Sequence, residues 1–132
     1  TELGLYMSKR KIYLENGMLV KTIDFDMSHY WLDWYQKLHL YEPGIVEVYG
    51  YQDRKIYMEF IDGQELFVSA NHKTIEQMIS ICQNILNFSK DNNINFYHHD
   101  LHFRNFLVEN ETNRVVLIDP DSFHLFKGGE WI

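Results

Sequence analysis

The sequence predicts one α+β domain in which short antiparallel strands accompany two helices. Two segments repeat apolar side chains with helical spacing, and other runs alternate or stay apolar over the length of a strand. Turn residues such as Asn16-Gly17 separate these segments. The chain has 132 residues, 45% of them hydrophobic, which is enough for one core. We therefore expect a single domain over residues 1–132.

Charge and composition argue against several classes of protein. The net charge of −7 disfavours general affinity for nucleic acid or for anionic membranes. Cys82 is the single cysteine, so no internal disulfide can form, and its apolar helical setting predicts an inert core thiol. No apolar run approaches the roughly 20 residues that span a bilayer. No leader segment opens the sequence either, so we expect a cytoplasmic protein without a membrane span.

The first forty residues predict a hairpin followed by a helix. Residues 11–15 and 18–23 flank Asn16-Gly17, a dipeptide that favours the tight primed turn of a β-hairpin. Aromatic side chains and Leu38 then recur with helical spacing over residues 30–38, and Ser28 is a candidate helix cap.

The rest of the chain predicts two more hairpins and a longer helix. Residues 44–51 and 55–61 have the pattern of paired strands. Residues 74–77 have the spacing of a capping box and open an amphipathic helix that we expect to end near residues 90–93. Residues 106–118 contain two apolar runs around a polar turn and predict the last hairpin.

Side-chain oxygens gather in the last third of the sequence. Asp100 is followed five positions later by Asn105, and Asp119 comes directly after an apolar run. Phosphoryl transfer requires a carboxylate that orients the attacking hydroxyl and oxygen ligands for the magnesium that bridges the phosphates. The three residues have this chemistry, and their order predicts a metal-assisted phosphoryl site.

This arrangement resembles the catalytic loop and metal-binding aspartate of the protein-kinase-like superfamily. The family pattern is His-x-Asp-Leu, then an Asn five positions after the Asp, then a strand that ends in Asp. The matching residues here are His98-His99-Asp100-Leu101, Asn105 and Asp119. Protein kinases usually place a lysine at the position of His102. At this position the sequence looks more like the aminoglycoside, choline and lipopolysaccharide-sugar kinases. The segment Asp119-Pro120-Asp121 also resembles the corresponding segment of those small-molecule kinases more than the Asp-Phe-Gly of protein kinases.

The resemblance implies a minimal protein-kinase-like fold. Residues 1–61 would form a small antiparallel sheet with one helix, and residues 62–132 a reduced, mainly helical lobe that carries the catalytic-loop hairpin. ATP and Mg2+ would be the cofactors. Asp100 and His102 would act on the transferred group, and Lys21 would hold the phosphates. Three residues would be metal ligands: Asn105, Asp119 and Asp121.

The resemblance also implies an adenine site in the segment that joins the two halves. Met58 would line the back of the pocket, while Glu59 and Ile61 would offer main-chain groups to the adenine edge. Glu65 would lie near the ribose. The acceptor remains open between a protein hydroxyl and a small hydroxyl compound, and a second copy or a partner protein would complete its site.

Departures from the family pattern keep a second function open, namely a pseudokinase that binds nucleotide or a protein without turnover. The first twenty residues contain only two glycines, so no glycine-rich phosphate loop is apparent. Residues 28–41 lack the glutamate that pairs with the strand lysine in kinases, which leaves Asp33 and Gln36 as substitutes. Only thirteen residues follow Asp119.

A third possibility is a transition-metal hydrolase, because three histidines lie close together around one aspartate in the sequence. His98 and His99 are adjacent, however, and neighbouring side chains on an extended segment point in opposite directions. We therefore expect that they do not both bind one ion.

Overall fold

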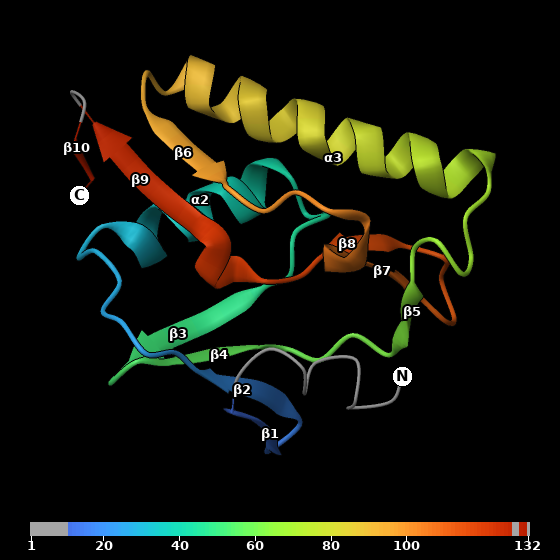
Figure 1. Cartoon of the computed structure of the whole chain (residues 1–132), viewed down its shortest axis with the longest axis horizontal. Helices are drawn as coiled ribbons and strands as arrows, with labels where there is room; N and C mark the ends of the chain where they lie inside the picture. Colours follow the sequence, from blue (N-terminus) through green and yellow to red (C-terminus); the bar gives the residue numbers. More distant parts are fainter. Residues whose placement is uncertain (1–10, 128–129, 132) are drawn as a thin grey trace.

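The computed structural model describes residues 11–127 and 130–131 (Figure 1). These residues form the expected mixture of α and β structure, with two helices and several antiparallel sheets. The strands are β1 (Lys11–Glu15), β2 (Met18–Thr22), β3 (Val48–Gln52), β4 (Lys55–Glu59), β5 (Gly63–Glu65), β6 (Asn95–His98), β7 (Phe106–Glu109), β8 (Val115–Leu117), β9 (Phe123–Lys127) and β10 (Glu130–Trp131). The helices are α2 (Trp31–Tyr41) and α3 (His72–Asp91), and short 3-10 turns occupy Phe103–Asn105 and Pro120–Ser122.

Strands β1 to β4 form one antiparallel sheet in the order β1-β2-β4-β3. The predicted hairpin around Asn16-Gly17 is confirmed, and both turn residues have positive φ values of 51° and 79°. The turn between β3 and β4 is built in the same way from Asp53 and Arg54, with φ values of 53° and 61°. Lys21 lies on the central strand β2, opposite Ile12 and Ile56.

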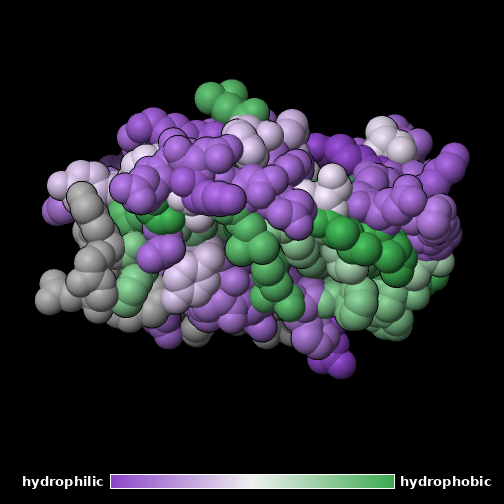
Figure 2. Space-filling view, turned by 90° about the horizontal axis from the view of Figure 1, so that it is seen from above, coloured by the Kyte–Doolittle hydropathy of each residue, from purple (hydrophilic) through white to green (hydrophobic). Residues whose placement is uncertain are grey.

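The second half of the chain forms one long helix and two three-stranded sheets around the predicted catalytic loop, so the expectation of a mainly helical lobe is wrong. The orders of the sheets are β10-β9-β6 and β5-β7-β8, and the predicted hairpin over residues 106–118 is confirmed as β7 and β8. Helix α3 packs on β6 and β8, on the opposite side of the molecule from the four-stranded sheet (Figure 1). Figure 2 looks onto this side and shows mainly hydrophilic residues, with a band of hydrophobic residues across the middle of the view.

Both helices begin differently from the prediction. Helix α3 starts one turn early, because Asn71 is its N-cap and Thr74 is the other member of the capping box. The Asn71 side chain accepts from the Thr74 amide at 3.0 Å, and the Thr74 hydroxyl accepts from the Asn71 amide at 2.9 Å. Helix α2 has Tyr30 at its N-cap position without a side-chain cap bond, while Ser28 Oγ accepts from the Tyr30 amide at 3.2 Å.

The predicted strand over residues 44–51 forms only from Val48 onward. Just before it, the chain runs alongside β8 of the other half, where the Val46 amide donates to the Leu117 carbonyl at 2.9 Å. The Leu117 amide in turn donates to the Gly44 carbonyl at 2.8 Å, and Ile45 forms a parallel bridge with Leu117. Pairing with a distant strand therefore replaced the local continuation of β3.

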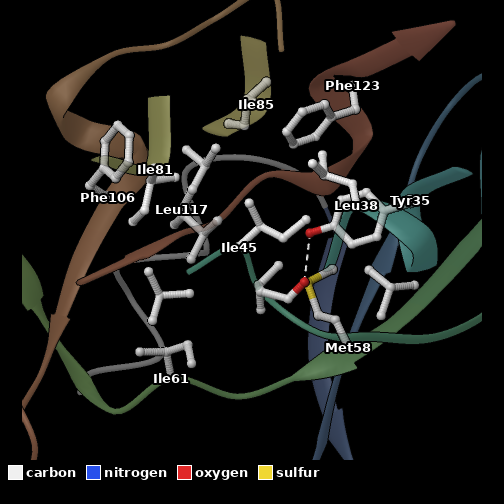
Figure 3. Packing of buried hydrophobic residues seen from close by; sticks show 14 of the residues in the cluster. Tyr35, Leu38, Ile45, Met58, Ile61, Ile81, Ile85, Phe106, Leu117 and Phe123 are labelled. Carbon is white, nitrogen blue, oxygen red and sulfur yellow. Dashed lines mark hydrogen bonds between the residues drawn. The ribbon is translucent and has the colours of Figure 1, made fainter. Parts of the chain in front are cut away.

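The buried apolar side chains form a cluster that includes both halves of the chain (Figure 3). Met58 from β4 and Ile45 lie at its centre, and Leu117 and Phe123 approach from the second half. The hydroxyl of the fully buried Tyr35 donates to the Val46 carbonyl at 2.6 Å, which satisfies a polar group inside the core. This packing holds the sheet with Lys21 against the segment with Asp119.

Candidate functional site

Lys21 is buried in an ion-pair cluster with two aspartates from the far end of the chain. Its side chain is only 5% exposed, and its Nζ lies 3.1 Å from Asp119 Oδ1 and 2.7 Å from Asp121 Oδ1. Both carboxylates are themselves mostly buried. A buried charge is costly unless it is paired, so each of these groups depends on the others. The strand lysine and two predicted metal ligands therefore meet at one place.

The backbone around Asp119 directs these carboxylates. Asp119 has a left-handed conformation, with φ 68° and ψ 59°, which is uncommon for a residue other than glycine. The Ser122 amide donates to the Asp119 carbonyl at 3.1 Å and closes a tight turn. Such conformations often lie at functional sites, where the surrounding structure maintains them. Here the turn brings both Asp119 and Asp121 within hydrogen-bond distance of Lys21.

Asn105 connects the predicted catalytic aspartate to this turn. Its side-chain amide donates to the Asp100 carbonyl at 2.7 Å and to Asp100 Oδ2 at 3.3 Å. The backbone carbonyl of Asn105 accepts from the amide of Ile118, the residue directly before Asp119, at 2.7 Å. Asn105 is almost completely buried, whereas Asp100 is exposed. The exposed carboxylate is therefore held by a buried neighbour whose backbone is bonded to the strand that leads to Asp119.

His98 braces the same loop from inside. Its ring is buried edge-on against Phe123, with 5.1 Å between ring centroids, and its Nδ1 accepts from the Asp100 amide at 3.1 Å. Burial lowers the pKa of His98 from 6.5 to about 4, although the carboxylates of Asp119 and Asp100 oppose this change. The ring is thus neutral at pH 7, and its role is to hold the loop.

The histidines that are crowded in the sequence lie apart in the structure. The ring of His98 faces Phe123, and the ring of His99 lies 4.6 Å from that of His124. His102 is exposed and accepts from the Arg104 amide within its own loop. Within residues 11–127 and 130–131, no group of three histidine, cysteine or acidic side chains could hold a metal. The transition-metal hydrolase therefore has no support in the described residues.

The predicted adenine segment is well packed. Met58 and Ile61 are buried, and Glu65 is half-buried on β5. The Glu59 amide donates to the Glu47 carbonyl at 2.9 Å, and a Glu59 carboxylate oxygen accepts from the Glu47 amide at 2.9 Å. The Glu59 amide is therefore already hydrogen-bonded within the protein.

The suggested substitutes for the kinase glutamate are wrong. Asp33 is exposed and pairs with Lys37 one helical turn away at 3.2 Å, while the Gln36 side chain donates to the Val48 carbonyl. Among the described residues, the ion-pair partners of Lys21 are Asp119 and Asp121. Sequence reasoning missed this pairing, although the missing glutamate in α2 and the close spacing of the two aspartates were available signals.

A small cavity of about 380 Å3 lies beside the predicted catalytic loop. It is lined mainly by apolar side chains, among them Leu101 and Phe103, and by His102. Cys82 also lines it and is half-buried, and burial raises the pKa of its thiol. A protonated thiol at neutral pH agrees with the inert role expected from the sequence.

Comparison of the chain with models of protein families gives no match, and comparison with curated proteins gives none either. Neither helix in the described part of the chain has the length and hydrophobicity that crossing a bilayer would require. The features that bear on function are therefore the ion-pair cluster of Lys21 and the loop from His98 to Asn105 beside it.

Proposed function

We propose that the chain is a protein-kinase-like phosphotransferase that transfers the terminal phosphoryl group of ATP to a hydroxyl acceptor with Mg2+. One observation carries this proposal: Lys21 forms buried ion pairs with Asp119 and Asp121, about one hundred residues later in the chain. The same turn is bonded through Ile118 to Asn105, which holds Asp100. A cation from the first half of the chain and oxygen donors from the second half are thereby close together, which supports the proposal.

The donor set fits the proposed metal. Mg2+ prefers hard oxygen ligands, and the carboxylates of Asp119 and Asp121 with the amide of Asn105 offer them. Two carboxylates beside one ammonium leave a net negative charge, which favours a further cation. Bound Mg2+ and ATP would supply the phosphoryl group and neutralise the charge that develops during its transfer.

The protein side chains have distinct roles in this proposal. Lys21 binds phosphate oxygens through its ammonium, which offsets the negative charge of the chain. Asp100 is exposed and orients the hydroxyl of the acceptor, and the Asn105 amide positions its carboxylate. His98 remains neutral and keeps the Asp100 backbone in place. The acceptor is a protein hydroxyl or a small hydroxyl compound.

The second candidate is a nucleotide-binding or protein-interaction module without turnover. The tight cluster around Lys21 favours it, because both aspartates already neutralise the lysine and α2 provides no acidic partner in their place. In that case the cluster would stabilise the fold and nucleotide would bind without reacting.

Thermal unfolding with nucleotide tests the proposal. ATP with Mg2+ should raise the melting temperature more than ATP with a chelator, because the aspartates hold the metal and the metal holds the phosphates. Asp119→Ala should remove this dependence on Mg2+. Asp100→Ala should keep the shift but abolish ATP turnover in the presence of an acceptor.

Asp33→Ala is the matched control, since Asp33 is an exposed aspartate whose partner is Lys37. It should keep the full Mg2+-dependent shift. If Asp119→Ala binds Mg2+ and ATP as tightly as the parent, the metal assignment is wrong. Binding without turnover would favour the second candidate, and no shift with any nucleotide would contradict both nucleotide-binding proposals.

A further inference from the structure

A cavity of about 680 Å3 lies beside the candidate site and outside it. Its walls come from Phe25–Ser28, from Trp31 at the start of α2, and from the paired strands β6 and β9 with the residue that follows β6. The lining residues from this part of the fold are Tyr97, His99, His124 and Leu125. The volume is within the range of small-molecule sites in proteins. Neither Lys21 nor the predicted catalytic and metal-binding residues line it.

Specific bonds hold the walls of this cavity in place. Trp31 is buried, and its indole N–H donates to the Phe123 carbonyl at 3.0 Å, which ties α2 to β9. The Met27 amide donates to the hydroxyl of Tyr51 on β3 at 3.0 Å. Because the segment between β2 and α2 is anchored to the sheet and the helix to β9, the space between them is part of the fold.

The lining is predominantly aromatic. Phe25, Trp31 and Tyr97 contribute ring systems, and the imidazoles of His99 and His124 lie 4.6 Å apart with a tilt of 32°. Burial, together with the neighbouring His99, lowers the pKa of His124, so this imidazole is neutral at pH 7. The faces of aromatic rings carry partial negative charge and attract cations.

The formal charge within the described lining is negative, and a guanidinium outside the lining pairs with it. Asp26 is the one charged residue among the described lining residues, and Arg54, which pairs with it at 3.0 Å, is not part of the lining. The whole chain has a net charge of −7. An anion would therefore find one carboxylate and no lysine or arginine side chain in the described lining.

We propose that this cavity binds a planar aromatic amine. Its ring would pack among Phe25, Tyr97 and the paired imidazoles, and its ammonium would lie toward Asp26 and the ring faces. The inference does not depend on the phosphotransferase proposal, because neither Lys21 nor any predicted catalytic or metal-binding residue lines the cavity. A metal ion is a poorer occupant, since the two imidazoles lie ring beside ring and the described residues offer no third ligand group.

Two probes with the same ring and opposite charge test this proposal on the full chain. Isothermal titration calorimetry should show tryptamine binding at least about tenfold more tightly than indole-3-acetate, because the cavity favours a cation. Histidine ring signals in NMR spectra should shift for His99 and His124 when tryptamine is added. An absence of tryptamine binding, or indole-3-acetate binding equally or more tightly, would overturn the proposal.

Variants locate the binding. Tyr97→Ala should weaken tryptamine binding about fivefold, because it removes one ring face from the cavity. Tyr49→Ala is the control: it removes another exposed tyrosine, 49% exposed on β3 against 36% for Tyr97, that does not line the cavity. Asp26→Asn should reduce the preference for tryptamine over indole-3-acetate. Equal effects of the two tyrosine variants, or an unchanged preference in Asp26→Asn, would contradict this site.

Discussion

The ammonium of Lys21 depends on two carboxylates that are far away in the sequence, so its removal should be costly. We expect Lys21→Met to lower the free energy of unfolding by about 3 kcal/mol, because it leaves the mostly buried Asp119 and Asp121 without their cation. Urea denaturation at pH 7 measures this change.

An exposed ion pair provides the control for this prediction. Arg54→Met breaks the pair between Arg54 and Asp26 on the surface, where water and salt screen the charges, and should leave the free energy of unfolding nearly unchanged. If Lys21→Met and Arg54→Met lower the free energy of unfolding by similar amounts, burial does not strengthen the contribution of the Lys21 ion pairs.

His98 should make the stability of the fold depend on pH. Its pKa is about 4 in the folded protein and near 6.5 when unfolded, so the unfolded chain binds an extra proton between these values. Stability is therefore complete above pH 6.5 and falls as the pH is lowered toward 4, by an amount on the order of 3 kcal/mol. Urea denaturation at pH 7 and pH 4.5 measures the loss.

His98→Gln should lose less stability than the parent over the same pH range. The difference between the two losses in free energy of unfolding is the contribution of His98. Carboxylates also titrate near the lower end, but both proteins share them. His72→Gln, at an exposed histidine on α3, should show the same dependence of stability on pH as the parent. If the stability of His98→Gln depends on pH as steeply as that of the parent, His98 is not the cause of the loss at low pH.

At the scale of elements, β5 lies so close to β7 that one position accepts only glycine. A Cβ at Gly63 would meet the backbone carbonyl of Val108, which cannot move without breaking the pairing of the two strands. We expect Gly63→Ala to lower the free energy of unfolding by about 2 kcal/mol, as overpacking commonly does. Thermal and urea unfolding followed by circular dichroism measure this loss.

Gly50 on β3 is the matched glycine, because a Cβ there would meet no atom within 4 Å. Gly50→Ala should be neutral or slightly stabilising, since alanine restricts the unfolded chain. If both alanine variants lose the same stability, the close approach of β5 and β7 is not the cause.

At the scale of the whole molecule, Leu117 joins the two halves of the chain. It is buried in the shared core and bonds through its backbone to residues 44 and 46. We expect Leu117→Ala to cost about 3 kcal/mol, from lost burial and the cavity that remains. Tryptophan fluorescence and far-ultraviolet circular dichroism should report one shared transition, because both halves unfold together.

Leu40 on α2 is the control, since its side chain is 84% exposed. Leu40→Ala should leave the unfolding midpoint almost unchanged. Two separate transitions in the parent or in Leu117→Ala would show that the halves of the chain are independent units.

Part of this fold and part of the site could be predicted locally. The turn at Asn16-Gly17, the helical spacing in α3 and the hairpin of β7 and β8 depend on residues that are close in the sequence. The early start of α3 was a local signal that the prediction missed, because the N-cap Asn71 and its partner Thr74 are three residues apart. The late start of β3 could not be predicted locally, because residues 44–46 bond to a strand from the other half of the chain.

The sequence by itself determined the kinds of elements and the chemical groups at residues 100, 105, 119 and 121, since turn propensity and side-chain chemistry are local properties. The tertiary structure alone decided which of these groups meet. Lys21 pairs with Asp119 and Asp121 rather than with Asp33 or Gln36, because packing across about one hundred residues sets that distance. The aromatic cavity depends on the tertiary structure for the same reason, since its walls come from segments that are distant along the chain.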